Sequence, residues 1–220
     1  EFTPPLQAST PCFDPEPLLM QSGHLLLAFA LVPRALADGT VYIIRHGEKV
    51  WKLGCLNDEG HERAHNLIRV FNGQPSPHHA TFSVPKALFA NWYDDPVDCE
   101  RCNQTLTPIS QALHLPIDLS HGGDQPGTGA GGGNTGAARA ILKALHSTGG
   151  PVLAAWEHVN IQHLAADLGV AEKDIPHWHG SDYDSVYVLE YAGEQLHSFE
   201  HLAQNFNGAV EAKGSVGLFV

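Results

Sequence analysis

Short apolar runs alternate with stretches of helical spacing through residues 40–192 of the chain. The apolar runs are rich in β-branched and aromatic side chains and predict buried strands that begin at residues 41, 87, 114, 151 and 184. Apolar residues at helical spacing predict helices over residues 57–71, 99–113, 136–147 and 160–169. This order predicts an α/β fold, a three-layer sandwich with a mostly parallel central sheet.

Local signals refine two of these helices. Pro108 lies inside the helix over residues 99–113 and is expected to kink or shorten it, because proline lacks the N–H that a helix interior uses. Residues 122–133 contain too much glycine to pack a core and are expected to form a flexible loop. Asn134 or Thr135 is expected to cap the helix that follows.

The composition allows one domain and argues against one class of partner. The 220 residues, 43% of them hydrophobic, are enough for a single buried α/β core, and no second catalytic domain is needed. The formal net charge of −12 repels a polyanionic backbone, so nucleic acid is not expected as a partner. Affinity for an anion must therefore come from a few converging side chains.

The first predicted strand stops at Arg45-His46-Gly47. The glycine opens a turn, so Arg45 and His46 are expected at the carboxyl end of the strand, where open α/β sheets bind their ligands. A neutral imidazole can attack an electrophile or carry a proton. The guanidinium beside it matches two oxygens of a phosphate. The tripeptide thus indicates a phosphoryl pocket with a nucleophilic histidine.

Two later junctions are of the same kind. Arg101 lies in the first turns of the helix after the second strand and is followed by Gln104 and Thr105. Glu157 and His158 end the strand that begins at residue 151. Three junctions that bring cationic or imidazole groups to one rim of one sheet are hard to explain by packing alone.

The whole pattern, a strand with Arg-His-Gly, then Arg-x-x-Gln-Thr on a helix, then a strand that ends in histidine, resembles the histidine phosphatase superfamily, also called phosphoglycerate mutase-like. The resemblance spans residues 40 to about 192. It implies that His46 is transiently phosphorylated. It also implies that the phosphoryl group is held by Arg45, Arg101 and His158.

The resemblance implies a phosphomonoester hydrolase that acts on a small phosphorylated substrate and releases inorganic phosphate, without a cofactor. Asn160 matches an asparagine of many members and is a further candidate for substrate contact, although Val159 stands where those members often have glycine. Mutases of the family carry a long insertion where this chain has a short glycine-rich loop, which favours hydrolysis over a mutase. A catalytically idle member that binds a phosphorylated ligand or partner protein is the other alternative, and the presence of all four pocket residues argues against it.

The departing alkoxide needs a proton, and a carboxylic acid with a raised pKa is the usual donor. Glu157 is the first candidate because it precedes His158 at the rim, although strand alternation points it away from that histidine. A surface carboxylate is an equally good interpretation of Glu157. The other candidates, on the loop before the second arginine, are Asp94, Asp95 and Asp98.

Other side chains are expected to be structural. Arg63 should form an ion pair on the surface of its helix. Trp92, Tyr93 and Trp178 can line a substrate cleft, but packing is the commoner role of such aromatic residues. No metal is expected, because no third ligand at supporting spacing joins the histidine and cysteine pairs. These pairs are His78 and His79, His177 and His179, and Cys99 and Cys102.

Residues 1–37 differ from the rest of the chain. They begin with a proline-rich stretch, and from Met20 they contain an apolar segment too short to span a membrane, followed by small residues at positions 35 and 37. This resembles a secretory signal peptide in front of a catalytic domain over residues 38–220, and it favours secretion or the secretory pathway, where a disulfide is plausible. An N-terminal helix that packs on the domain of a cytoplasmic protein is the alternative. The oligomeric state is left open.

Overall fold

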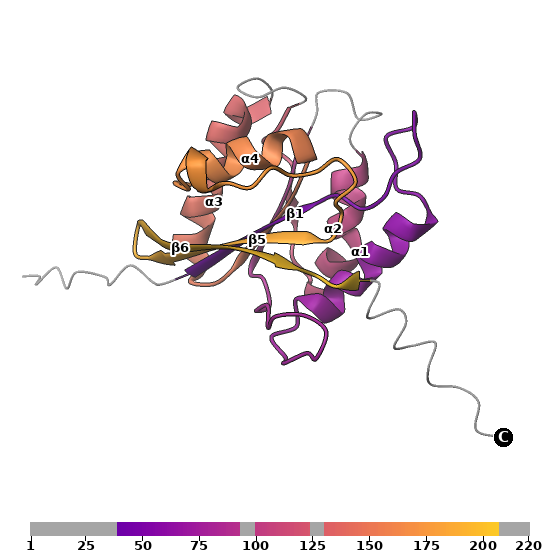
Figure 1. Cartoon of the computed structure of the whole chain (residues 1–220), viewed down its shortest axis with the longest axis horizontal. Helices are drawn as coiled ribbons and strands as arrows, with labels where there is room; N and C mark the ends of the chain where they lie inside the picture. The colour runs from indigo at the N-terminus through magenta and orange to yellow at the C-terminus, as the bar shows by residue number, and fades with distance from the viewer. Residues whose placement is uncertain (1–38, 93–99, 124–129, 207–220) are drawn as a thin grey trace, which may run out of the picture. The chain divides into compact units, whose positions relative to one another are not determined.

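The computed structural model describes residues 39–92, 100–123 and 130–206; Figure 1 shows how their elements are arranged. The strands of the described part are β1 (Gly39–Arg45), β2 (Ala87–Ala90), β3 (Ile117–Asp118), β4 (Val152–Trp156), β5 (Ser185–Ala192) and β6 (Gln195–Ala203). Its α-helices are α1 (Asp58–Val70), α2 (Glu100–Leu113), α3 (Gly133–Thr148) and α4 (His158–Asp167). Two short 3-10 helices, η1 (Ala130–Gly132) and η2 (Glu172–Asp174), precede α3 and follow α4. The signal-like segment and the boundary near residue 38 lie outside the described residues.

The strands form one mixed sheet in the order β3-β2-β4-β1-β5-β6. The first four strands of this order run parallel to one another, whereas β5 and β6 are antiparallel to their neighbours. The predicted α/β class with a mostly parallel sheet is confirmed. The prediction had no counterpart for β6, because this edge strand is only half buried and its polar side chains hide the strand pattern. The strand expected from residue 114 is reduced to the two residues of β3.

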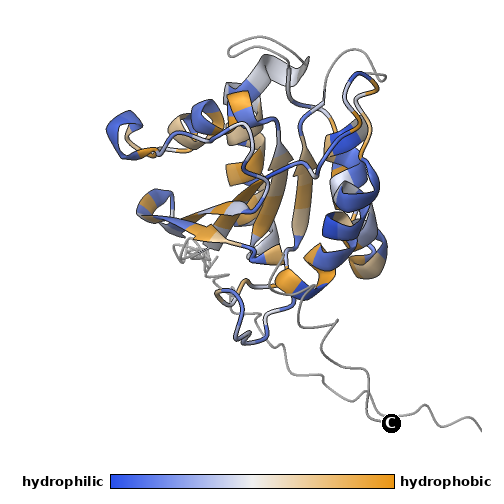
Figure 2. Cartoon of the chain, turned by 45° about the vertical axis from the view of Figure 1, so that its right-hand side comes forward, coloured by the Kyte–Doolittle hydropathy of each residue, from blue (hydrophilic) through white to orange (hydrophobic). Residues whose placement is uncertain are grey.

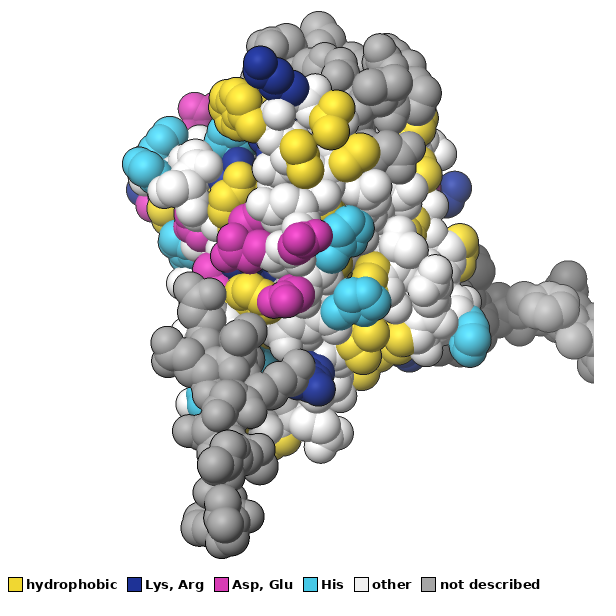
Figure 3. Space-filling model, turned by 90° about the vertical axis from the view of Figure 1, so that its right-hand side faces the viewer, with side chains coloured by type: hydrophobic (Ala, Val, Ile, Leu, Met, Phe, Trp, Pro, Cys, Tyr) yellow, Lys and Arg dark blue, Asp and Glu magenta, His cyan; other side chains and the backbone are white. Residues whose placement is uncertain are grey.

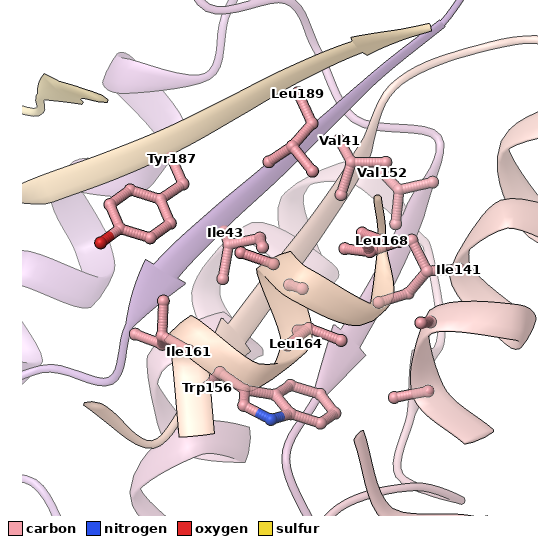
Figure 4. Packing of buried hydrophobic residues seen from close by; sticks show 14 of the residues in the cluster. Val41, Ile43, Ile141, Val152, Trp156, Ile161, Leu164, Leu168, Tyr187 and Leu189 are labelled. Atoms are coloured by element: carbon pink, nitrogen blue, oxygen red, sulfur yellow. The ribbon is translucent and has the colours of Figure 1, made fainter. Parts of the chain in front are cut away.

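Helices cover both faces of the sheet, as a three-layer sandwich requires (Figure 1). Successive residues of β1 point to opposite faces, so Val41 and Ile43 pack with α3 and α4, while Tyr42 and Ile44 pack with α1 and α2. The strands between these layers are predominantly hydrophobic (Figure 2). Figure 4 shows the first of the two clusters, in which the Trp156 ring lies beside side chains of α4.

Three helices differ in detail from the prediction. Pro108 does not shorten α2, which continues to Leu113. The hydroxyls of Thr105 and Thr107 donate to carbonyls one turn back, and they supply side-chain hydrogen bonds in the part of the helix where proline donates none. The residue that caps α3 is Gly132, with φ 85°, and not Asn134 or Thr135. The helix α4 begins two residues earlier than predicted.

The topology brings the predicted site residues to one edge. Because β1, β2 and β4 are parallel neighbours, their carboxyl ends lie at the same edge of the sheet. The Arg-His-Gly turn follows β1 there. Glu157 is the single residue between β4 and α4, so His158 opens the helix instead of ending the strand.

Candidate active site

The Arg-His-Gly turn is fixed by three neighbouring elements. The His46 N–H donates to the Trp156 carbonyl at 3.2 Å, which continues the pairing of β1 with β4. The Gly47 N–H donates to Thr105 Oγ1 in α2 at 2.9 Å. A Cβ atom on Gly47 would lie 2.9 Å from backbone atoms of Gly60 in the first turn of α1, so the close approach of this helix requires glycine.

The ring of His46 is fully buried and held in one orientation. Its Nδ1 lies 2.7 Å from the Gly47 carbonyl oxygen. Since a carbonyl only accepts, Nδ1 carries a hydrogen, and Nε2 is the ring nitrogen that faces the Glu157 carboxylate, to which it can donate only while the ring is protonated. Burial lowers the pKa of His46, and the nearby Glu157 carboxylate opposes this effect. Orientation by a backbone carbonyl is what a nucleophilic histidine at this position needs.

The carboxylate of Glu157 lies at the centre of the site. Its Oε2 lies 3.1 Å from His46 Nε2 and accepts from Arg101 Nη2 at 2.8 Å and Arg101 Nε at 3.2 Å. Its Oε1 lies 3.0 Å from His158 Nδ1. Burial alone would raise the pKa of Glu157, but the contacts with His158 and His46 and the charge of Arg101 outweigh it and hold the pKa far below its usual range.

Two expectations about Glu157 need correction. It does not point away from His158, because as the N-cap of α4 it has left the strand alternation and both side chains turn to the same side. Its pKa is lowered in this structure, whereas a proton donor needs a raised one. The alternative donors Asp94, Asp95 and Asp98 lie outside the described residues.

Arg45 is buried beside this cluster. Its Nη1 donates to the carbonyls of Gly180 at 2.6 Å and Asp182 at 3.2 Å, and its guanidinium stacks on the Tyr183 ring at 3.9 Å. Its Nε is buried without a hydrogen-bond partner among the described residues. Burial lowers the pKa of Arg45. The charge of Glu157 opposes this effect, whereas the charge of Arg101 adds to it. The loop before β5 therefore fixes Arg45 while one of its donors stays unused.

The side chain of Asn160 forms its hydrogen bonds with buried groups of the protein. It is fully buried, its amide nitrogen donates to the Gly123 carbonyl at 2.8 Å, and its amide oxygen accepts from Asn134 at 3.0 Å. The Asn134 oxygen in turn accepts from the Trp156 indole at 2.9 Å. This chain of hydrogen bonds ties the loop after β3 to β4 and α4. It favours a positioning role for Asn160 over direct contact with a substrate.

Three further residues belong to the site and were not assigned from the sequence. Gln104 and Thr105 were read as parts of a motif, and they bind the backbone at Leu56 and Gly47. Lys49 lies close enough to Arg101 that this positive charge, after burial, lowers the pKa of Lys49. The only sequence signal for Lys49 was its place three residues after His46.

Arg63 and Trp178 turn out to be interior residues. Arg63 is 4% exposed and binds both carboxylate oxygens of Glu48, at 2.6 to 3.1 Å, and it also lies 3.2 Å from Asp184. The ion pair was expected, but its place on the helix surface was wrong. Trp178 is buried and packs on Tyr187 with ring centroids 4.7 Å apart, so it belongs to the core. Tyr93 lies outside the described residues.

The described residues contain no group of three or more histidine, cysteine, aspartate or glutamate side chains arranged to hold a metal ion. Within the same ranges, none of the helices is both long and apolar enough to cross a bilayer. A disulfide of an exported chain could use any of the four cysteines, and two of them, Cys12 and Cys99, lie outside these ranges, so it stays a prediction with its pairing open.

No protein-family model matches the chain, and no curated protein matches it by sequence. Several solved structures match its fold. The alpha-ribazole phosphatase from Shigella flexneri is 13% identical with a TM-score of 0.47, and the match covers 76% of this chain and 96% of that one. The mycobacterial glucosyl-3-phosphoglycerate phosphatase, solved with inorganic phosphate, is 16% identical with a TM-score of 0.45, and the match covers 74% and 94%.

A third match is a protein assigned as the phosphohistidine phosphatase SixA from Agrobacterium tumefaciens, 15% identical with a TM-score of 0.39 over 73% of this chain and 97% of that one. All three belong to the histidine phosphatase superfamily, which the sequence motifs resemble. At this identity the likeness concerns the fold alone. What the site does has to be inferred from its own residues.

Proposed function

We propose that the protein is a phosphomonoester hydrolase that acts through a phosphohistidine at His46. One observation carries the proposal: a single carboxylate, that of Glu157, is held jointly by Arg101, His158 and the Nε2 edge of His46. These groups form an anion site with a potential nucleophile in its wall. A phosphoryl group that replaced the carboxylate would find the same donors for its oxygens and Nε2 facing its phosphorus.

In the first step, His46 passes the hydrogen on Nε2 to the Glu157 carboxylate; the freed lone pair of Nε2 then forms the nitrogen–phosphorus bond while the bond from phosphorus to the leaving oxygen breaks. The two arginines and His158 bind the three other oxygens, whose charge they offset in the transition state. Gly47 keeps the hydrogen on Nδ1, so Nε2 stays directed at phosphorus. In the second step, a water oxygen attacks phosphorus, the nitrogen–phosphorus bond breaks, and inorganic phosphate leaves.

Glu157 is proposed as the proton donor despite its lowered pKa in this structure. The value is low because the carboxylate binds Arg101 and both histidines. A phosphoryl group that takes over these partners removes the stabilisation and places negative charge beside the carboxyl group. Burial and like charge then both raise its pKa, so Glu157 can carry a proton to the leaving oxygen. In the second step the carboxylate takes a proton from the attacking water.

The proposal is tested by phosphate release from 4-nitrophenyl phosphate and from a panel of small phosphoesters. His46→Ala should abolish turnover and the acid-labile phosphoryl label on the protein. His163→Ala, which removes an exposed histidine of α4, is the matched control and should leave both unchanged. Wild-type protein that binds inorganic phosphate but hydrolyses none of the panel would favour the alternative, a catalytically idle phosphate-binding member of the fold. Transfer of the label to a second substrate hydroxyl instead of water would identify a mutase.

A further inference from the structure

Beside the anion site, a short hairpin connects β1 with α1. Lys49 pairs with Leu56 in an isolated antiparallel bridge, and the Val50 N–H donates to the Cys55 carbonyl at 2.9 Å. Two contacts fasten the hairpin to α2, from the Arg101 N–H to the Gly54 carbonyl at 3.2 Å and from the Leu56 N–H to Gln104 Oε1 at 2.8 Å. The hairpin is therefore held against the helix that supplies Arg101.

A pocket of about 270 Å³ lies between the hairpin and α2. The residues that line it are Lys49, Trp51, Lys52, Gly54 and Arg101. Arg101 also binds the carboxylate at the centre of the anion site, so the pocket and the anion site share a side chain. A leaving group attached to a bound phosphoryl group has this pocket as its neighbour. The volume suits a single ring with a substituent.

The lining is cationic and aromatic. It contains three permanently or usually charged bases, and no acidic side chain is present in its described lining, although the whole chain carries a net charge of −12. The Lys49 ammonium lies 5.3 Å from the centre of the Trp51 ring, and the Trp51 side chain is 79% exposed. A flat group can stack on the indole while an anionic substituent meets the ammonium groups.

The tip of the hairpin is a tight turn, in which the Leu53 N–H donates to the Val50 carbonyl at 3.2 Å. Lys52 is the third residue of this turn and has φ 93°, as such a turn requires. The turn places the Trp51 and Lys52 side chains together at the tip of the hairpin. Figure 3 faces this side of the molecule and shows hydrophobic side chains next to a basic one in its upper part.

We infer that this pocket binds the leaving group of the substrate, and that the substrate is a phosphomonoester whose planar leaving group carries a second anionic group. The inference rests on the proposed hydrolase activity and adds the class of substrate. Val50 and Leu53 are also exposed on the hairpin, so contact with a membrane is the competing role. The net charge of −12 opposes binding to an anionic bilayer, and the small cationic pocket favours a small ligand.

The test compares 4-carboxyphenyl phosphate with 4-carbamoylphenyl phosphate, which have leaving groups of similar size and differ in charge. Wild-type protein should hydrolyse the carboxylate ester with a kcat/KM about three- to tenfold higher. The double substitution Lys49→Met and Lys52→Met should bring the ratio of the two kcat/KM values to about one, whatever it does to the absolute rates. Trp51→Ala should raise KM for both aryl esters but not for glycerol phosphate. Lys143→Met, at an exposed position of α3, is the control. It should change neither the preference for the carboxylate ester nor the KM values of the aryl esters.

Equal kcat/KM for the two esters in wild-type protein, or a preference that survives the double substitution, would overturn the inference while leaving the hydrolase proposal intact. If neither ester is turned over and His46→Ala changes nothing, the hydrolase proposal fails instead. In that case the two benzylphosphonates with the same 4-carboxy and 4-carbamoyl substituents, which cannot be hydrolysed, test the pocket by binding. Tighter binding of the carboxylate compound would support the pocket, and equal affinities would reject it. Binding to phosphatidylserine vesicles that Trp51→Ala abolishes, with unchanged kinetics on both esters, would show a membrane contact and reject the leaving-group pocket.

Discussion

Thr105 joins the Arg-His-Gly turn to the helix that carries Arg101. Its hydroxyl oxygen accepts the Gly47 N–H at 2.9 Å, and its hydrogen is donated to the Arg101 carbonyl at 2.7 Å. Thr105 is fully buried, so water cannot replace either contact. One side chain thereby fixes the Arg-His-Gly turn relative to the helix that supplies Arg101.

Thr105→Val should therefore weaken the site without removing any group from it. Valine has the same shape but leaves the Gly47 N–H buried and unbonded, which costs about 1 to 3 kcal/mol of stability. We expect kcat to fall more than KM rises, because His46, the proposed nucleophile, and Arg101 lose their relative position. Thr107→Val removes the same kind of hydroxyl hydrogen bond two residues further along the helix and serves as the control. Equal effects of the two substitutions on kcat would mean that Thr105 has no positioning role.

Glu157→Gln separates two proposed roles of this side chain: it occupies the anion site in the free protein, and it donates a proton to the leaving oxygen. A neutral amide competes less well for the anion site, so orthovanadate and inorganic phosphate should bind several-fold more tightly than to the wild-type protein. Loss of the proton donor should lower kcat by about a hundredfold or more for an alkyl phosphate. For 4-nitrophenyl phosphate, whose leaving group needs little protonation, the loss should be small. A uniform loss across leaving groups would rule out proton donation by Glu157.

The lowered pKa of Glu157 also predicts a pH dependence of stability. Because its pKa is lower in the folded protein than in the unfolded chain, the folded state binds fewer protons there. The stability contributed by the ionised group is present above the unfolded value of about 4.3 and is lost as pH falls toward the lower folded value. In urea titrations, the free energy of unfolding of wild-type protein relative to Glu157→Gln should be constant between about pH 7 and 5 and shrink below about pH 4. A difference that grows on acidification would contradict the lowered pKa.

Asn160→Ala decides whether Asn160 contacts the substrate, as the sequence indicates, or positions the loop after β3, as the structure favours. Removal of the amide leaves the Gly123 carbonyl and the Asn134 side chain without their partner, so the melting temperature should fall by several degrees. If Asn160 only positions the loop, the inhibition constant of inorganic phosphate should change little. Gln162→Ala, which removes one contact to the Pro176 carbonyl from the same helix, is the control. A large rise in that inhibition constant with an unchanged melting temperature would restore Asn160 as a phosphate ligand.

The sequence predicted those parts of the site that depend on local pattern. Arg45 and His46 follow a buried run that could only be a strand, and the parallel order of strands brings His158 to the same edge. The inward position of Glu157 could not be predicted, because it depends on α4 beginning directly after β4, where a shift of one residue reverses the direction of a side chain.

Other features of the fold and the site could not be predicted, because they leave no periodic pattern of apolar residues in the sequence. The hairpin that carries Lys49 pairs through a single isolated bridge, which is too short to give a strand pattern in the sequence. Its position against Arg101 comes from contacts with α2, which is distant in sequence. Burial of Arg63 depends on Glu48 and Asp184, one of them 121 residues away, and nothing in its own helix indicates this. Edge strand β6 alternates too weakly to be distinguished from a polar loop.

The last prediction concerns residues 1–37, which we propose to be a signal segment of an exported phosphatase. Within the part of the chain that the structure describes, both hydrophobic clusters lie between residues 41 and 202. If residues 1–37 are a signal segment, a chain that starts at Asp38 should keep the proposed phosphatase activity and the melting temperature of the full chain. If residues 25–32 instead pack as a helix on the domain, their removal would expose several large apolar side chains, each of which stabilises by about 1.5 to 3 kcal/mol. The measurement is a thermal melt of the two chains side by side. A fall of many degrees, or insoluble protein, would reject the signal segment and with it the reason to place the protein in the secretory pathway.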